Sequence, residues 1–202
     1  ILYRLVGSEM CIRDRSRTGF TNELGWEIYF RPENNAEKIG DLILSEGKKM
    51  GMILTATPSF RGRRIEAGLL SAGQDFDKNT NPFSVGLGKF VDLDKKDFIG
   101  KKALSNLEKK CRTWGLRVKE SVALKGENIF SNRKVIGRVT SSTWSPFQVC
   151  GVAIIHLNND QFGPSSVIDV KCSDGKIYKG EICSLPMYLS LIHISEPTRR
   201  YR

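Results

Sequence analysis

The chain has 202 residues, a net charge of +10, 40% hydrophobic residues and 27% charged residues. This composition is typical of a globular protein and excludes an intrinsically disordered chain, and no apolar run approaches the roughly 18 residues that a membrane span requires. The positive charge could favour an acidic small molecule. Because the lysines lie in scattered pairs without interleaved aromatic residues, nucleic-acid binding is not expected, and most of the charge is interpreted as a solvated surface.

The two ends of the sequence look like an artefact at the DNA level. The peptides SEMCIRD (residues 8–14) and LSLIHIS (residues 189–195) are translations of one DNA sequence read on opposite strands, and that DNA resembles a sequencing adaptor. We therefore expect residues 1–15 and 189–202 to be adaptor-derived, and we exclude them from the fold reasoning. On this interpretation the chain is a fragment whose native termini lie outside the sequence.

Between these ends, the first half of the chain predicts one strand and three helices. Residues 26–30 are rich in aromatic and β-branched residues, which favours a strand. Residues 36–49 carry apolar residues on one helical face, with Asn34 or Asn35 as the N-cap. A second, short helix is predicted over 63–70, and a third is expected to open with Asp97 as its N-cap.

After Lys110 the pattern changes to short alternating apolar runs separated by turn signals. Runs of this kind predict strands, and several strands at this spacing predict a small antiparallel barrel or sandwich. The predicted strands span residues 114–118, 135–140, 149–155, 167–170 and 177–182. We therefore predict an α+β fold with two domains, residues 16–110 and residues 111–188.

Cysteine and histidine usage argues against metal, redox and triad chemistry. Cys111, Cys150, Cys172 and Cys183 form no Cys-x-x-Cys pair, so neither a zinc site nor a redox motif is signalled. Buried free thiols suit a reducing compartment, and we expect a cytoplasmic protein. His156, the only histidine outside the two ends, follows an apolar run and is interpreted as a strand residue instead of a catalytic base.

Several phrases in order carry a family resemblance. The segment SRTGFTNELGWEIY (residues 16–29) resembles the Ser-Arg-x-Gly-Tyr-Thr-Gly-Glu segment of the glycine-cleavage T-proteins, which are aminomethyltransferases. Four further phrases match in the family's order: RRIEAGLLSAGQDFD (63–77) with TNPFSVGLG (80–88), DFIGKKAL (97–104), GRVTSSTWSP (137–146) and LPMY (185–188). The resemblance implies the C-terminal part of a folate-binding domain followed by the family's C-terminal β-barrel.

The resemblance also implies tetrahydrofolate as the cofactor and assigns four residues to its site. Glu27 takes the position of the pterin-binding carboxylate, and Phe20 that of a ring-contacting tyrosine, whose hydroxyl it lacks. Arg64 matches its own motif position, and Arg61 is the displaced counterpart of a folate-contacting arginine; planar guanidinium groups suit folate carboxylates or a pterin carbonyl. Asn22 departs from the family pattern, which has a glycine there.

No catalytic residue and no metal site are expected within the sequence. The resemblance implies a catalytic aspartate, but that residue would lie in a missing N-terminal part. The acidic pairs Asp75 with Asp77 and Asp92 with Asp94 lack further oxygen ligands at fixed spacing, so they are interpreted as turn or capping residues.

The predicted function is a fragment of a tetrahydrofolate-dependent one-carbon transferase that takes its carbon from an amine or sulfonium small molecule. Ser84 and Lys89 depart from the glycine-cleavage pattern and favour relatives such as the dimethylsulfoniopropionate demethylases. A lipoyl carrier protein would be a partner only of a true glycine-cleavage enzyme.

Two alternatives remain. One is the C-terminal region of a sarcosine or dimethylglycine dehydrogenase, and the other is a non-catalytic folate-binding RNA-modification factor. The fragment itself is expected to be inactive and to expose apolar surface.

Overall fold

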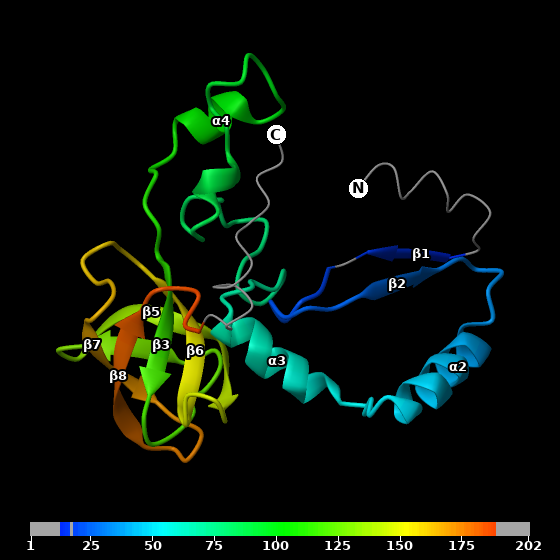
Figure 1. Cartoon of the computed structure of the whole chain (residues 1–202). Helices are drawn as coiled ribbons and strands as arrows, with labels where there is room; N and C mark the ends of the chain where they lie inside the picture. The colour runs from blue at the N-terminus through cyan, green and yellow to red at the C-terminus, as the bar shows by residue number, and fades with distance from the viewer. Residues whose placement is uncertain (1–12, 17, 189–202) are drawn as a thin grey trace. The chain divides into compact units, whose positions relative to one another are not determined.

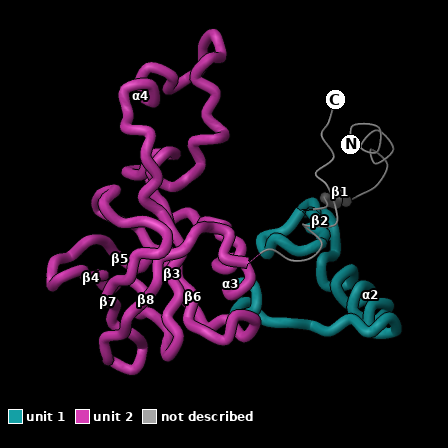
Figure 2. The backbone as a smooth tube through the Cα atoms, turned by 60° about the vertical axis from the view of Figure 1, so that its left-hand side comes forward, with its two compact units in different colours: residues 1–60, 190–202 teal, residues 61–189 magenta. Residues whose placement is uncertain are grey.

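The computed structural model describes residues 13–16 and 18–188. The predicted adaptor segments fall outside these residues, except for positions 13–15. The chain divides into two compact units, shown in Figure 2: residues 1–60 with 190–202, called the N-terminal unit, and residues 61–189, called the barrel unit. The boundary between the two compact units falls at residue 60. The domain boundary predicted from the sequence, at residue 110, stays a prediction.

Among its described residues, the N-terminal unit contains a two-stranded antiparallel sheet and helix α2 (Ala36–Lys49; Figure 1). Strand β1 (Arg13–Ser16) pairs with β2 (Glu27–Phe30), with Ser16 opposite Glu27. Helix α2 follows, and the Asn35 side chain accepts a hydrogen bond of 2.9 Å from the Lys38 backbone N–H. The predicted strand and helix are thus confirmed, with Asn35 as the N-cap.

The N-terminal unit has no hydrophobic core among its described residues, because none of residues 18–60 is buried. Its large apolar side chains are exposed, among them Trp26 at 61%, Leu42 at 56% and Leu54 at 80%. Helix α2 is amphipathic, yet it buries no residue. An amphipathic helix normally packs its apolar stripe against another surface, so this unit presents an unusually apolar face.

The other two helices differ from their predicted positions. Helix α3 (Thr57–Glu66) begins six residues before the predicted start and ends four residues before the predicted end. It stops there because Gly68 adopts φ +70° while the Gly68 and Leu69 N–H groups bond back to Ile65 and Arg64 carbonyls, a glycine-terminated helix end.

The third helix, α4 (Lys101–Ser105), does not open at Asp97, so that predicted N-cap is wrong. Its N-cap is Gly100, which adopts φ +92° and makes no side-chain capping bond. The Lys101 N–H bonds to the Phe98 carbonyl, so a turn occupies the positions after Asp97 and delays the helix. A short 3-10 turn, η1 (Gly88–Phe90), precedes this region.

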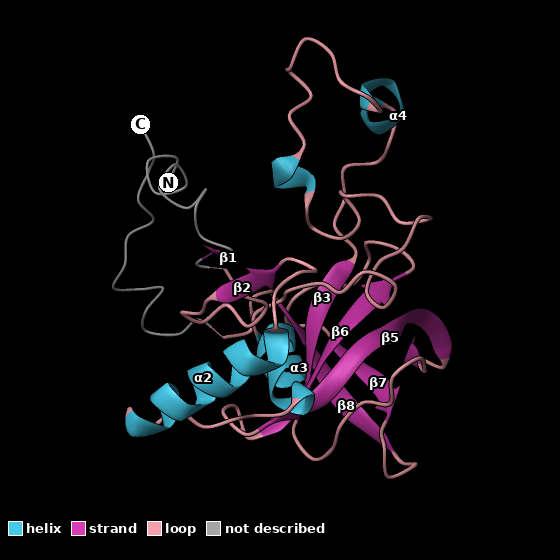
Figure 3. Ribbon diagram, turned by 90° about the vertical axis from the view of Figure 1, so that its right-hand side faces the viewer, coloured by secondary structure: helices cyan, strands magenta, loops and turns pink. Residues whose placement is uncertain are grey.

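Six antiparallel strands close into a barrel in the order β3-β6-β5-β4-β7-β8, which confirms the predicted fold class. Figure 3 draws the barrel strands in magenta. Closure leaves no unpaired sheet edge. The strands are β3 (Thr113–Val118), β4 (Asn128–Ser131), β5 (Lys134–Ser145), β6 (Cys150–Leu157), β7 (Val167–Lys171) and β8 (Ile177–Cys183).

Strand β4 was not predicted. It joins β5 through a two-residue turn in which Asn132 (φ +48°) and Arg133 (φ +63°) both have positive φ. Such hairpins usually carry Asn-Gly, so the arginine at the second position conceals the turn signal.

Strand β6 is buried on both faces and separates two apolar clusters. Ala153, Ile155 and Leu157 belong to the core inside the barrel. Cys150, Val152 and Ile154 belong to a second cluster, which also includes Ile65 of α3 and Met187. The C-terminal end of α3 therefore packs with the β6 residues that are not part of the barrel interior. In the described ranges, no helix is long and apolar enough to cross a membrane.

Candidate functional site

Glu27, the predicted pterin-binding carboxylate, lies at the start of β2 with its side chain exposed. One oxygen, Oε2, accepts hydrogen bonds from the Thr18 hydroxyl and from the Tyr29 hydroxyl, the latter at 3.0 Å. Both bonds lower the pKa of Glu27 below its ordinary value of 4.5, and the bond from Thr18 has the larger effect. The result is an exposed, ionised carboxylate held in place through one of its two oxygens.

The turn before β2 explains one departure from the family motif. Asn22 adopts φ +58°, in the left-handed region that glycine enters without cost and asparagine tolerates best among other residues. The asparagine therefore stands in place of the motif's glycine at a position where the backbone is left-handed. Phe20 precedes it with a side chain that is 47% exposed, so its ring remains available for contact.

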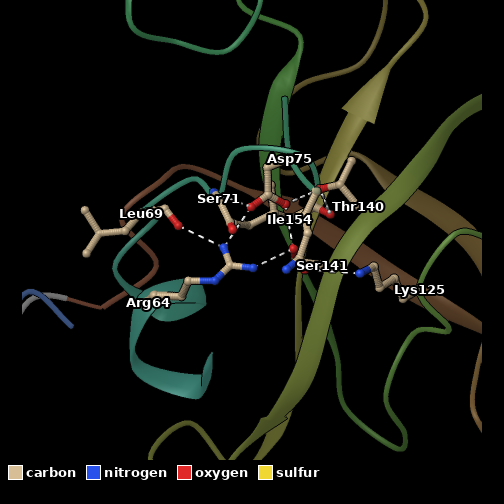
Figure 4. A network of polar contacts seen from close by, with 9 residues as sticks. Arg64, Leu69, Ser71, Asp75, Lys125, Thr140, Ser141 and Ile154 are labelled. Atoms are coloured by element: carbon tan, nitrogen blue, oxygen red, sulfur yellow. Dashed lines mark hydrogen bonds and ion pairs between the residues drawn. The ribbon is translucent and has the colours of Figure 1, made fainter. Parts of the chain in front are cut away.

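Only 4% of the surface of Arg64 is exposed, unlike that of Glu27 or Phe20. Figure 4 shows its polar contacts. Its Nη1 donates to the Leu69 carbonyl at 2.9 Å and to Asp75 Oδ2 at 2.7 Å, while Nη2 donates to Ser141 Oγ at 2.7 Å. The guanidinium is thus engaged within the chain. These contacts favour a structural role, and the expectation that Arg64 binds the cofactor stays a prediction that they do not support.

Asp75 is the centre of this buried network. Besides the Arg64 ion pair, Oδ2 accepts the Ser71 backbone N–H at 2.8 Å, and Oδ1 accepts the Thr140 and Ser141 hydroxyls, each at 2.6 Å. The Asp75 side chain has no exposed surface. A buried carboxylate needs such donors and a counter-charge, and the network supplies both.

A second, half-buried ion pair joins Arg63 and Glu66. Glu66, which is 2% exposed, accepts from Arg63 Nη1 at 2.6 Å and from the Ser145 hydroxyl. Arg63 also lies 5.7 Å from the centroid of the Phe147 ring and 5.3 Å from that of Tyr188. The Glu66 carbonyl accepts the Met187 N–H, so this pair joins α3 to both β5 and the C-terminal segment of the barrel unit.

Arg61 is exposed on α3, one turn before Arg64. The sequence grouped Arg61 and Arg64 with Glu27 and Phe20 in one cofactor site. In the structure Glu27 and Phe20 belong to the N-terminal unit, and the two arginines belong to the barrel unit.

Two kinds of residue were missed by sequence reasoning. Thr18 and Tyr29 position the Glu27 carboxylate, and the i, i+2 spacing of Glu27 and Tyr29 on one strand face was a usable signal. Asp75 and Ser141 were inside quoted motifs, but no local pattern indicates that residues so far apart in the chain meet. Among residues 13–16 and 18–188, no three or more His, Cys, Asp or Glu side chains gather as a metal site would require.

Two family models match the chain. The GCVT N-terminal domain matches residues 9–95, and the glycine cleavage T-protein C-terminal barrel domain matches residues 112–188. The second match covers all six barrel strands, and the first covers both segments that hold the predicted cofactor residues.

Individual relatives agree with these matches. An aminomethyltransferase from Halothermothrix orenii is 33% identical over 186 residues, which is 90% of this chain and 51% of the relative. A trimethylamine-oxide aldolase from Ruegeria pomeroyi is 34% identical over 165 residues, or 79% of this chain and 21% of that protein.

A solved structure extends the agreement to the fold. The crystal structure of glycine cleavage system aminomethyltransferase T from Bartonella henselae aligns with a TM-score of 0.76 at 25% identity, covering 88% of this chain and 50% of that one. The chain spans about half the length of the curated aminomethyltransferases that it matches. Both family models, these relatives and the shared fold agree, and the chain belongs to the glycine cleavage T-protein family.

Proposed function

We propose that this chain forms the Glu27-bearing part of a tetrahydrofolate-dependent one-carbon transferase. The observation that carries the proposal is the state of Glu27: an exposed, ionised carboxylate that uses one oxygen for Thr18 and Tyr29. The other oxygen, Oε1, accepts no hydrogen bond that involves the described residues. A pterin ring edge presents adjacent N–H donors, and a carboxylate fixed in this way matches them.

The remaining predicted contacts fit the same ligand in chemical terms. Phe20 offers an exposed aromatic ring, which suits packing on a flat pterin without the hydroxyl bond of a tyrosine. Arg61 offers an exposed guanidinium, which suits a folate carboxylate. Arg64 is left out of the proposed ligand set because its donors are engaged with Asp75, Ser141 and Leu69.

Bound tetrahydrofolate would supply the nitrogen that receives the one-carbon unit. The donor in this proposal is a small amine or sulfonium, and a lipoyl carrier protein is a partner if the whole protein is a glycine-cleavage enzyme. The aspartate that assists transfer would come from a preceding segment, so the 202-residue chain by itself is proposed to be inactive. In this proposal Glu27 and Phe20 bind and orient the ligand, and Arg61 stays a predicted contact.

The test joins this chain to the N-terminal half of the Halothermothrix orenii relative and measures tetrahydrofolate binding by calorimetry. Replacing the charged acceptor, Glu27→Gln, should weaken binding by about tenfold, the scale of one charge-assisted hydrogen bond. Glu33→Gln, which removes another exposed carboxylate of the same unit, is the matched control and should leave binding unchanged. Equal dissociation constants for the parent and Glu27→Gln would refute the assignment.

The pH dependence provides a second readout. Because the pKa of Glu27 lies below its ordinary value, the binding-competent carboxylate persists above that lowered pKa and is lost as pH falls through it. Removing the donors by Thr18→Val or Tyr29→Phe should raise the Glu27 pKa and move the acid limb of folate binding to higher pH. An unmoved acid limb in both variants would show that Glu27 does not control it.

A second candidate function rests on one comparison. The trimethylamine-oxide aldolase relative is a much longer protein, of which this chain covers 21%. A segment similar to this chain therefore occurs inside a larger protein, as the dehydrogenase alternative requires. Sequencing the locus upstream of Ser16 decides between a stand-alone transferase and a fused one.

A further inference from the structure

A shallow groove of about 270 Å³ lies within the barrel unit. Three segments line it: the loop at residues 73–77, the turn at residues 125–126 and residues 138–140 of β5. Because a cavity of about 150 Å³ is enough to hold benzene, the groove has room for a small organic molecule. None of the predicted cofactor residues lines it, and Val139 is the one lining residue that belongs to an apolar cluster, the core inside the barrel.

Two cationic side chains face this groove. Lys125, labelled in Figure 4, donates one hydrogen bond of 3.1 Å to Gln74 Oε1, which leaves two ammonium hydrogens for a ligand. Arg138 is exposed on β5, and within the described residues its guanidinium forms no hydrogen bond or ion pair. The groove thus offers a planar guanidinium fork together with an ammonium group.

One carboxylate, that of Asp77, faces the same groove. Its Oδ1 accepts the Asn79 backbone N–H at 2.9 Å and the Thr80 hydroxyl at 3.0 Å, whereas Oδ2 accepts no hydrogen bond from the part of the chain that the structure describes. The Asn79 and Thr80 bonds, and after them the charge of Arg138, lower the pKa of Asp77, so the carboxylate is ionised. Arg138 influences Asp77 in this way without forming an ion pair with it among the described residues.

We infer that this groove binds a small zwitterionic molecule, with its carboxylate on Arg138 and Lys125 and its ammonium group on Asp77 Oδ2. A simple anion would be attracted by Lys125 and Arg138 and repelled by Asp77. A simple cation would be attracted by Asp77 and repelled by the two basic side chains. A ligand with both charges satisfies all three groups. Gly73 and Gly126 line the groove without side chains, and a Cβ at either would meet no heavy atom within 4 Å, so access is open.

The test titrates the complete ¹⁵N-labelled 202-residue chain with glycine, β-alanine and γ-aminobutyrate, which differ in the spacing of their two charges. Acetate and propylammonium serve as single-charge probes. At least one zwitterion should give saturable amide shifts at Gly73 and Gly126, with an affinity about tenfold above that of acetate, the scale of one additional charge-assisted bond. The absence of saturation for all three zwitterions, or acetate binding as tightly, would overturn the inference.

Variants locate the binding. Arg138→Gln and Asp77→Asn should each weaken the zwitterion by about tenfold. Asp77→Asn keeps an oxygen for the Asn79 and Thr80 bonds, so the turn is preserved. Lys134→Gln removes another exposed cation of β5 outside the groove lining and is the matched control. A loss of affinity that is equal in all three variants would place the binding elsewhere and refute the assignment.

Discussion

Removing Arg64 should destabilise the barrel unit by about 3–5 kcal/mol, the cost of breaking a buried ion pair from one side. The test is Arg64→Met, an apolar side chain of comparable length. It leaves the Asp75 carboxylate, whose side chain has no exposed surface, without its counter-charge. The Ser71, Thr140 and Ser141 donors remain, but none of them carries a positive charge. A loss of this size is a large part of the ordinary stability of a domain.

A double-mutant cycle isolates the ion pair from the lost packing. Asp75→Asn should also lower the free energy of unfolding, because it leaves the Arg64 guanidinium buried opposite a neutral amide. In the double variant Arg64→Met/Asp75→Asn, neither charge remains, so its cost should be well below the sum of the two single costs. Urea unfolding followed by tryptophan fluorescence, with Trp114 in β3 as a barrel probe, measures each free energy of unfolding.

The buried ion pair would be refuted if the losses of unfolding free energy in the two single variants were additive, or if Arg64→Met lost less than about 1 kcal/mol. Either result would place the guanidinium in a solvated site. Arg61→Met is the matched control on the same helix. Arg61 is exposed, so its replacement should change the free energy of unfolding by no more than about 0.5 kcal/mol.

Two other predictions concern the barrel strands. Gly151→Ala should destabilise the barrel by about 1–3 kcal/mol or more, because a Cβ there would lie 2.0 Å from the Ser121 carbonyl oxygen, whereas Gly163→Ala, with no atom within 4 Å, should be nearly neutral in the same urea assay. Burial raises the pKa of the Cys183 thiol to about 11, so at pH 8 this cysteine should resist iodoacetamide in the native protein and be labelled in urea. Mass mapping that finds Cys183 alkylated as fast in the native state as in urea would contradict the burial.

Much of the barrel could be predicted because each of its strands carries a local signal. Apolar runs bounded by turn residues predict strands wherever they occur, and five of the six strands were found in this way. The sixth, β4, was missed because its turn uses Asn132 and Arg133 in place of Asn-Gly. The α3 boundaries were wrong because Pro58, a residue common in the first turn of helices, was not used as a start signal and Gly68 was not used as a stop.

The candidate site was less predictable, because a motif match does not distinguish a ligand-binding residue from a structural one. Glu27 and Arg64 match the family pattern equally well in sequence. In the structure Glu27 is exposed, and one of its carboxylate oxygens accepts no hydrogen bond from the described residues. Arg64 is 4% exposed, and its guanidinium donates to partners within the chain. The difference arises from Asp75 and Ser141, which lie 11 and 77 residues away from Arg64 in the chain. Neither hydrophobic periodicity nor the spacing of residues within a motif indicates contacts between residues so far apart in the chain.

The structural role of Arg64 also affects Arg61, the neighbouring residue that is predicted to contact folate. Arg64, Ile65 and Glu66 end α3 with an ion pair to Asp75, an apolar contact with the second cluster, and a bond to Ser145. Three consecutive residues thus fix the last turn of α3 against the barrel. A group held on a rigid element loses less freedom on binding a ligand, and Arg61 lies one turn back on this anchored helix. The RRIE sequence therefore has a structural role at the end of α3, which explains how residues of a family motif can be buried.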